Sequence, residues 1–137
     1  ADEESPDLLL CMATLTGAAR VALGTDIVPF YSTSEGFSDF LVKGGQDSFD
    51  PVWQLPFFVP YESLIETDIA DLDNAPANGM AGSITAALFL KRFTDKTKIF
   101  SHFDIYGWSQ TSKPGRKRGG TMQGARAIFE AINRMFC

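Results

Sequence analysis

The sequence predicts a domain of the α/β class, and three observations favour this prediction. Apolar runs of strand length, such as residues 8–12, are bounded by turn residues, which is typical of buried strands. Segments in which apolar side chains recur with helical spacing follow these runs, so strands and helices alternate. The 137 residues are 45% hydrophobic and contain no linker long enough to divide them, so residues 1–137 are expected to form a single domain with a substantial core.

The first predicted strand and the turn after it organise the rest of the prediction. Residues 7–14 fit a strand buried on both faces, and residues 17–23 fit a helix that ends at a glycine. Small residues between them, Thr14, Thr16 and Gly17, permit a sharp turn. Ligands of α/β sheets bind beyond the carboxyl ends of strands, so this turn is a candidate binding site. On the local pattern alone, an ordinary connection without a ligand is favoured, because glycine and threonine are common turn residues.

Two further elements are predicted before the middle of the chain. Residues 27–31 fit a short strand, in which Pro29 indicates an edge position or irregular pairing because proline has no N–H for strand pairing. Residues 34–43 fit a helix, which Gly44 and Gly45 are expected to end.

The middle of the chain is rich in proline and aromatic residues. Residues 46–60 are expected to be extended, and their aromatic side chains have to be covered by the core or by a partner. Residues 61–66 fit a short helix, and residues 68–74 fit a half-buried strand or a loop. The clearest helix spans residues 83–93 and is apolar almost all round, so we expect it to be buried centrally or at a subunit interface.

The last part of the chain is predicted to contain a strand at 98–106, a long polar loop at 107–120 and a helix at 122–136. One apolar stripe of that helix is expected to face the core, and it consists of Met122, Ala125, Phe129, Ile132 and Phe136. The charged residues of the opposite face are Arg126, Glu130 and Arg134.

Charge and cysteine content exclude some classes of function. A net charge of −5 argues against a nucleic-acid surface, because such surfaces gain affinity by neutralising phosphates. No run approaches the roughly 20 apolar residues of a membrane span, so no membrane partner is expected. Cys11 within a predicted strand and Cys137 at the end do not form a disulfide framework, which favours a reducing compartment such as the cytoplasm.

Isolated catalytic or metal-binding groups are scarce. His102 is the only histidine, which excludes a two-His zinc motif within the chain. It could act as a base beside Asp104, but no nucleophile elbow accompanies it, and a structural histidine is favoured. An acidic cluster does not have the spacing of a calcium-binding loop, so caps and solvated charges are favoured there. Its members are Glu66, Asp68, Asp71 and Asp73.

A basic, glycine-rich loop covers residues 113–118. It could hold an anion or nucleic acid, but it lacks the residue order of a phosphate loop and aromatic residues for base stacking. An exposed loop or a subunit contact is favoured.

Three stretches are distinctive in combination: Ala13-Thr14-Leu15-Thr16-Gly17-Ala18, residues 68–72 followed by 81–90, and His102-Phe103-Asp104-Ile105-Tyr106-Gly107. In this order, and with Trp-Gln-Leu-Pro at 53–56, they resemble the catalytic domain of the leucyl (cytosol) aminopeptidase family. The resemblance covers nearly the whole chain and implies a mixed β-sheet flanked by helices.

The resemblance implies a metal-dependent aminopeptidase that removes N-terminal residues from peptides. Family members use two divalent metals, zinc or manganese, which bind the substrate's free amine and polarise the scissile carbonyl. The family's metal-ligand signature, Asn-Thr-Asp-Ala-Glu-Gly-Arg, does not occur here and is expected before Ala1. The chain therefore resembles the C-terminal part of that domain. No catalytic or metal-binding residue is expected within it, and by itself it is expected to be inactive.

By the same resemblance, the residues that line the substrate cleft are Thr14, Leu15, Gly17, Tyr106 and Ser109. The Leu15 carbonyl is expected to face the substrate or the active-site water, and Tyr106 and Ser109 to wall the pocket for the N-terminal side chain. The family commonly has alanine at the Tyr106 position, so tyrosine is expected to shrink or polarise this pocket. Family members are hexamers, which implies a homo-oligomer.

Two alternatives remain open. The chain could be a catalytically inert fragment with a structural or oligomerisation role. It could also bind nucleic acid through residues 113–118, although the acidic net charge opposes this.

Overall fold

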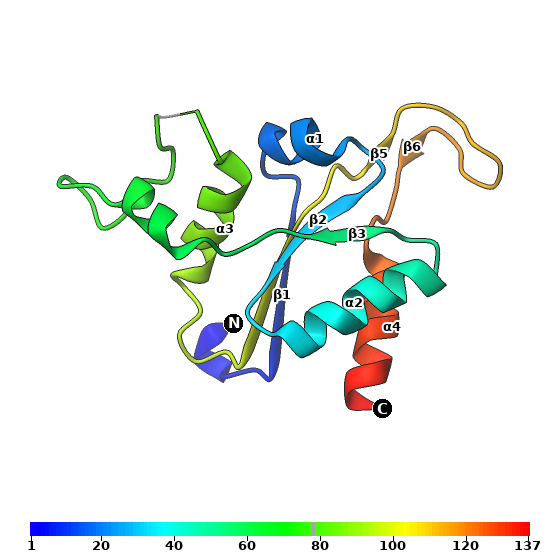
Figure 1. The fold of residues 1–137 in the computed structure, drawn as a ribbon, viewed down its shortest axis with the longest axis horizontal. Coiled ribbons are helices and arrows are strands. Elements are labelled where there is room, and N and C mark those ends of the chain that lie inside the picture. The colour runs from blue at the N-terminus through cyan, green and yellow to red at the C-terminus, as the bar shows by residue number, and fades with distance from the viewer. Residues whose placement is uncertain (78) are drawn as a thin grey trace.

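A mixed four-stranded sheet lies at the centre of the computed structural model, which describes every residue except 78 (Figure 1). The strand order is β1-β4-β2-β3. Strand β1 (Leu8–Ala13) is parallel to β4 (Ile99–Asp104), β4 is antiparallel to β2 (Val28–Ser32), and β2 is parallel to β3 (Val52–Gln54). The predicted α/β class, with a mixed sheet flanked by helices, is therefore confirmed.

Helices cover both faces of this sheet. Helix α3 packs on one side, whereas α2 and α4 pack against each other on the other side (Figure 1). The helices are α1 (Gly17–Leu23), α2 (Glu35–Asp47), α3 (Gly82–Lys91) and α4 (Ala125–Phe136), with short 3-10 helices η1 (Asp2–Glu4) and η2 (Val59–Ile65). The predicted polar loop at 107–120 contains a small hairpin of β5 (Trp108–Ser109) and β6 (Gly119–Gly120). Among the described residues, no helix has the length and apolar character needed to cross a membrane.

Strand β4, rather than β1, is the strand buried on both faces. Phe103 belongs to the core cluster beneath α2 and α4, whereas His102 stacks on Tyr31 in the layer beneath α3, with ring centroids 6.0 Å apart. Strand β1 lies at the edge of this sheet, and Met12 is 40% exposed. The prediction of a doubly buried first strand was wrong because an apolar run indicates a strand but not its place in the strand order.

Of the two alternatives predicted for Pro29, an edge position was wrong. Strand β2 lies between β4 and β3, and Pro29 is paired in register with Trp53 of β3. The ladder between β2 and β4 begins one residue later, at Phe30. Proline is tolerated because it precedes that ladder.

Helix α2 continues through Gly44 and Gly45 instead of ending at them. A Cβ atom on Gly44 would lie 2.8 Å from the Ala127 carbonyl oxygen, and one on Gly45 would lie 2.8 Å from the Asp50 carbonyl oxygen. The glycines therefore allow α4 and the chain after α2 to approach closely, and they do not serve as a helix stop.

The prediction that one apolar stripe of the last helix faces the core was wrong for three of its five residues, whereas Ala125 is half-buried and Ile132 packs against the core. Met122, Phe129 and Phe136 are 77%, 62% and 51% exposed, and the buried residues of α4 are instead Ala127, Ile128 and Ala131. Close packing against the glycines of α2 favours small side chains at this contact. The charged face lies beside α2 too, where an Arg134 nitrogen lies 2.7 Å from an Asp47 oxygen.

Candidate active site

The candidate site lies where two parallel strands end side by side. Ala13, the last residue of β1, is paired with Asp104, the last residue of β4. The Ile105 N–H donates to the Ala13 carbonyl at 2.9 Å, which keeps the two chains together beyond the strands. The turn after β1 therefore lies beside the segment after β4 that carries Tyr106, at the edge of the sheet where α/β proteins bind ligands.

The Asp104 carboxylate holds this turn in place. One oxygen accepts hydrogen bonds from the N–H groups of Leu15 and Thr16, each at 3.1 Å. The other accepts the Thr16 hydroxyl at 2.5 Å and the Ser83 hydroxyl at 3.2 Å. Thr16 also caps α1, because its hydroxyl oxygen accepts the Ala19 N–H at 3.3 Å. The carboxylate thus connects β4, the turn, α1 and α3.

Two buried aromatic residues, Tyr31 and His102, lie close to this carboxylate and interact with it directly or through Ser83. The Tyr31 hydroxyl donates to the Ser83 hydroxyl at 2.7 Å, and burial raises the pKa of Tyr31 to about 12. Burial also lowers the pKa of His102. Two weaker influences raise it: the Asp104 charge, and a contact at 3.2 Å between His102 Nδ1 and the Cys11 carbonyl oxygen. No hydrogen-bond partner of His102 Nε2 is found among the described residues. A fully buried, neutral imidazole agrees with the structural role predicted for it.

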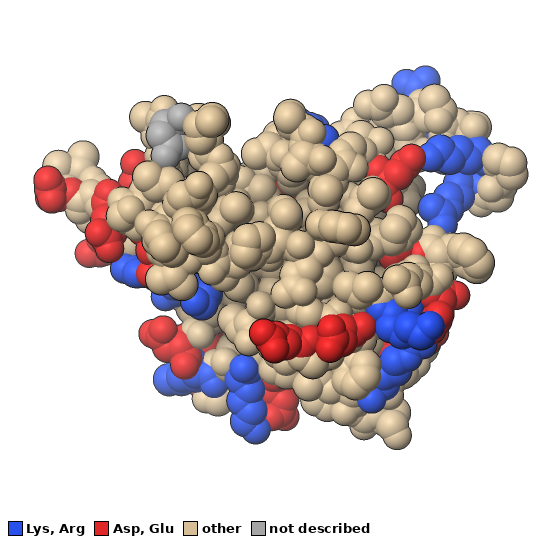
Figure 2. Space-filling view, in the orientation of Figure 1, with Lys and Arg blue, Asp and Glu red and all other residues tan. Residues whose placement is uncertain are grey.

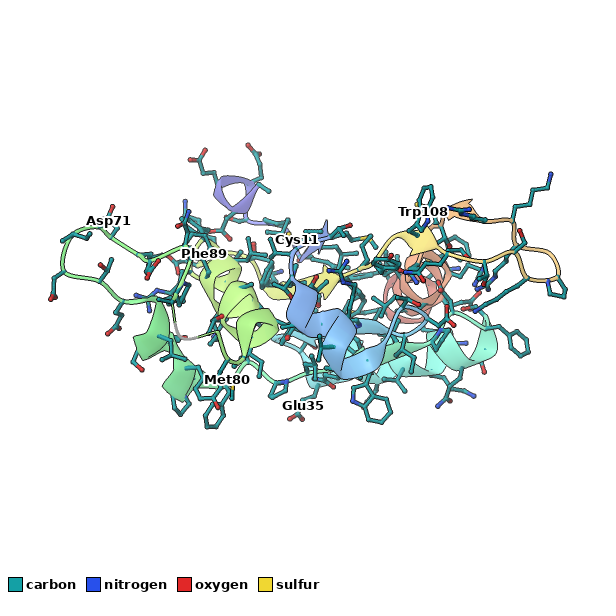
Figure 3. All side chains as sticks on the ribbon, turned by 90° about the horizontal axis from the view of Figure 1, so that it is seen from above. Cys11, Glu35, Asp71, Met80, Phe89 and Trp108 are labelled. Atoms are coloured by element: carbon teal, nitrogen blue, oxygen red, sulfur yellow. The ribbon has the colours of Figure 1, made fainter. Side chains whose placement is uncertain are left out.

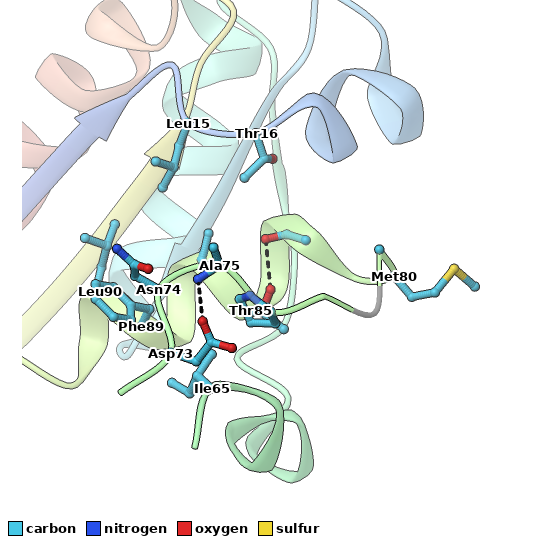
Figure 4. A pocket seen from close by; sticks show the side chains of 14 residues that line it. Leu15, Thr16, Ile65, Asp73, Asn74, Ala75, Met80, Thr85, Phe89 and Leu90 are labelled. Atoms are coloured by element: carbon cyan, nitrogen blue, oxygen red, sulfur yellow. Dashed lines mark hydrogen bonds between the residues drawn. The ribbon is translucent and has the colours of Figure 1, made fainter. Parts of the chain in front are cut away.

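A cavity of about 510 Å³ opens beside the turn (Figure 4). Leu15, which is 47% exposed, lines this cavity together with Thr16. Helix α3 contributes apolar side chains, among them Phe89 and Leu90, and Asn74 contributes a polar group from the segment after η2. An apolar cavity with a few polar groups suits part of an organic ligand. The helix predicted at 83–93 is therefore not buried all round, because one face lines this cavity.

Three of the predicted cleft residues lie close together outside this cavity. The Thr14 hydroxyl oxygen is 3.7 Å from where a Cβ atom on Gly107 would stand, next to Tyr106. The Arg20 guanidinium carbon lies 5.2 Å from the centre of the Tyr106 ring, and an Arg20 nitrogen lies 3.5 Å from the Cβ position of Gly17. Arg20 was not predicted to lie at the site, since a single arginine on a short helix gives no signal of what it contacts.

Ser109 lies apart from the cavity beside Leu15. It lines a second cavity of about 290 Å³ together with Asp26 and Lys113. Its hydroxyl donates to the Thr111 carbonyl at 2.8 Å, within the polar loop. The structure therefore brings four of the five predicted residues to one sheet edge and places the fifth in the hairpin beyond it.

The acidic cluster at residues 66–73 and the basic loop at residues 113–118 lie at opposite ends of the molecule (Figure 2). Acidic side chains cover the loop after η2, with Asp71 at its outer end, and basic side chains cover the hairpin that follows Trp108 (Figure 3). Lys113 in that hairpin forms an ion pair with Asp26 at 2.7 Å. In the described part of the chain, no group of three or more His, Cys, Asp or Glu residues could hold a metal ion. The residues present thus do not fit the two-metal site of the resembled family.

Comparison with known proteins identifies the family. The pattern described as "Cytosol aminopeptidase family, catalytic domain" matches residues 1–129. A probable cytosol aminopeptidase of Chlorobaculum parvum is 44% identical over 131 residues, which are 95% of this chain and 26% of that protein. The chain spans about a quarter of the length of such relatives.

Solved structures lead to the same family. The crystal structure of a cytosol aminopeptidase from Coxiella burnetii superposes with a TM-score of 0.91 at 38% identity, over 98% of this chain and 30% of that one. The bottromycin maturation enzyme BotP in complex with Mn superposes with a TM-score of 0.84 at 25% identity, over 94% of this chain and 29% of that one. This chain belongs to the cytosol aminopeptidase family, and it matches the catalytic domain of that family.

Proposed function

We propose that this chain is the substrate-positioning part of a metal-dependent aminopeptidase that removes N-terminal residues from peptides. The observation that supports this role best is the turn at residues 14–17. It lies at the carboxyl ends of β1 and β4, is fixed by Asp104, and borders an apolar cavity. A wall of this kind holds a substrate in register, which is a large part of what an enzyme contributes to rate.

Five residues receive the substrate in this proposal. Thr14, Leu15 and Gly17 line the cleft, and the Leu15 carbonyl faces the substrate. Tyr106 and Ser109 wall the pocket for the N-terminal side chain. Because Arg20 stands over the Tyr106 ring, this pocket is narrower and more polar than one with alanine at position 106. Leucine is therefore not expected to be the preferred N-terminal residue.

The proposal includes two divalent metal ions, manganese or zinc, held by residues outside this chain. The described residues offer no group of ligands for them, so no chemical step is assigned to a metal within the chain. Manganese is present in the BotP complex, a structure related in fold.

We further propose a hexamer in the cytoplasm. Aromatic side chains that remain exposed, such as Trp53 at 59% and Phe93 at 59%, suit burial between subunits. The free cysteines Cys11 and Cys137 suit a reducing compartment.

An aminopeptidase assay tests the proposal directly. The full-length protein that contains this chain is expected to hydrolyse amino-acid p-nitroanilides when manganese or zinc is supplied, and to lose activity when a chelator removes the metal. Residues 1–137 alone are expected to show no turnover. Among leucine, alanine and serine p-nitroanilides, leucine is expected not to be the best substrate of the full-length protein.

Each other result has a definite meaning. Turnover by residues 1–137 alone would contradict the placement of the metal ligands outside this chain. A full-length protein that neither binds metal nor hydrolyses these substrates would favour an inert, structural role.

A further inference from the structure

We propose that Asp104 is a positioning residue for the aminopeptidase reaction, which acts by orienting the Leu15 carbonyl toward the substrate. This inference rests on the function proposed above. It adds a residue that contacts no substrate and that works through the backbone of the turn.

The geometry of one peptide group carries the inference. The Thr16 N–H donates to Asp104 Oδ1 at 3.1 Å. The Leu15 carbonyl belongs to the same peptide group, and no cis peptide bond occurs among the described residues. In a planar trans peptide, the N–H and the C=O point in opposite directions. Fixing the Thr16 N–H on the carboxylate therefore directs the Leu15 carbonyl away from Asp104.

A second bond removes the remaining freedom of this peptide. The Leu15 N–H donates to the same Asp104 oxygen, also at 3.1 Å, so both ends of the Leu15 backbone are anchored. No hydrogen bond within the described part of the chain uses the Leu15 carbonyl, which leaves it available to a ligand. The Leu15 side chain lines the 510 Å³ cavity, so the anchored residue is also the one that borders the proposed substrate space.

The carboxylate is itself held rigidly. Asp104 is 3% exposed, and its second oxygen accepts the hydroxyls of Thr16 and Ser83. Tyr31 in turn donates to Ser83, so the carboxylate cannot rotate without breaking a buried network. Supporting hydrogen bonds of this kind keep an active-site group within a fraction of an ångström of its productive position.

The chain contains a matched control at Asp50. This carboxylate is 5% exposed and likewise accepts consecutive backbone N–H groups, at 3.0 Å from Arg126 and 3.4 Å from Ala127, as well as the Gly124 N–H at 3.1 Å. It caps α4, and within the described part of the chain its hydrogen bonds go to Gly124, Arg126 and Ala127 rather than to the turn. Substitution of Asp50 therefore reports the cost of losing a buried backbone-binding carboxylate without disturbing Leu15.

The test compares Asp104→Asn, Asp104→Ala and Asp50→Asn in the full-length protein. Thermal unfolding, kcat and KM are measured at a temperature at which each variant is folded, together with hydrogen–deuterium exchange of the peptide that covers residues 13–20. Both Asn variants are expected to lower the Tm. Asp104→Asn is expected to reduce kcat by roughly 10- to 100-fold with KM within about threefold, since small misplacements of positioning groups have effects of this size. Asp104→Ala should reduce kcat further, and Asp50→Asn should leave kcat within about twofold.

Exchange gives a readout that does not depend on activity. The amides of Leu15 and Thr16 are expected to exchange faster in Asp104→Asn and to be unchanged in Asp50→Asn. A wild-type kcat in Asp104→Asn, or equal losses of kcat in both Asn variants, would overturn the positioning role while leaving the aminopeptidase proposal intact. An inactive wild-type protein would instead remove the proposed function and this role with it. If Asp104→Ala does not fold, Asp104→Asn alone decides between these outcomes, because it preserves the shape of the side chain.

Discussion

At the scale of single residues, burial decides how the polar groups near the turn behave. His102 and Asp104 are adjacent on the same face of β4, yet one is kept neutral and the other accepts four hydrogen bonds. The pKa of His102 is lowered from its ordinary value of 6.5 chiefly because burial disfavours the imidazolium. This histidine therefore links the stability of the fold to pH.

Stability is expected to fall as the pH drops below about 6.5. Since the pKa of His102 is lower in the folded chain, only the unfolded chain takes up the proton between its ordinary pKa and the folded one. The stabilising contribution is complete above the unfolded pKa and is lost as the pH falls through that window. One proton limits the slope to about 1.4 kcal/mol per pH unit. Urea unfolding between pH 7 and 5.5 measures how the free energy of unfolding changes with pH. His102→Gln should make this change smaller. An equal slope in the variant would show that other groups cause the pH dependence.

At the scale of elements, the contact between α2 and α4 depends on glycines that the sequence alone presents as a helix stop. The Cβ position of Gly44 lies 2.8 Å from the Ala127 carbonyl oxygen and 2.9 Å from the Glu130 Cβ atom. Neither neighbour can move without shifting α4, because both belong to its backbone or to the first atom of a side chain.

Gly44→Ala is therefore expected to destabilise the protein by roughly 1–3 kcal/mol, as overpacking of a close contact does. The control in the same helix is Gly36→Ala, whose Cβ atom would meet only the Ser34 hydroxyl oxygen, at 4.0 Å. That change should be neutral or should stabilise by up to about 1 kcal/mol, because alanine favours helix over glycine. Denaturant unfolding of both variants measures the difference, and a stable Gly44→Ala variant would show that the helices separate at little cost.

At the scale of the whole molecule, the charge distribution opposes nucleic-acid binding. The net charge is −5, and the charge of the basic hairpin is partly neutralised by the ion pair of Lys113 with Asp26. Arg116 is oriented by a hydrogen bond to the Phe49 carbonyl at 3.3 Å. No salt-sensitive binding of a labelled DNA duplex is expected by fluorescence anisotropy at 50 or 200 mM salt. Binding that weakens with salt and disappears in a Lys117→Ser, Arg118→Ser variant would contradict this expectation.

Local patterns predicted most elements of this molecule within a few residues. The turn at 14–17 was found from small residues after an apolar run, and the resemblance to the cytosol aminopeptidase family was found from short motifs. The failures share one cause. The place of β1 in the sheet, the role of Gly44 and Gly45, and the buried face of α4 all depend on partners far along the chain, which periodicity cannot identify.

The sequence by itself determined the α/β class, the turn after the first strand and the family to which the chain belongs. Only the tertiary structure decided what holds that turn and what lies over the Tyr106 ring. The Leu15 N–H and the Asp104 carboxylate are 89 residues apart, and Arg20 meets Tyr106 only because β1 and β4 are paired in register. The physical reason is that backbone propensities act over a few residues, whereas a binding site is built from contacts that form when distant segments pack together.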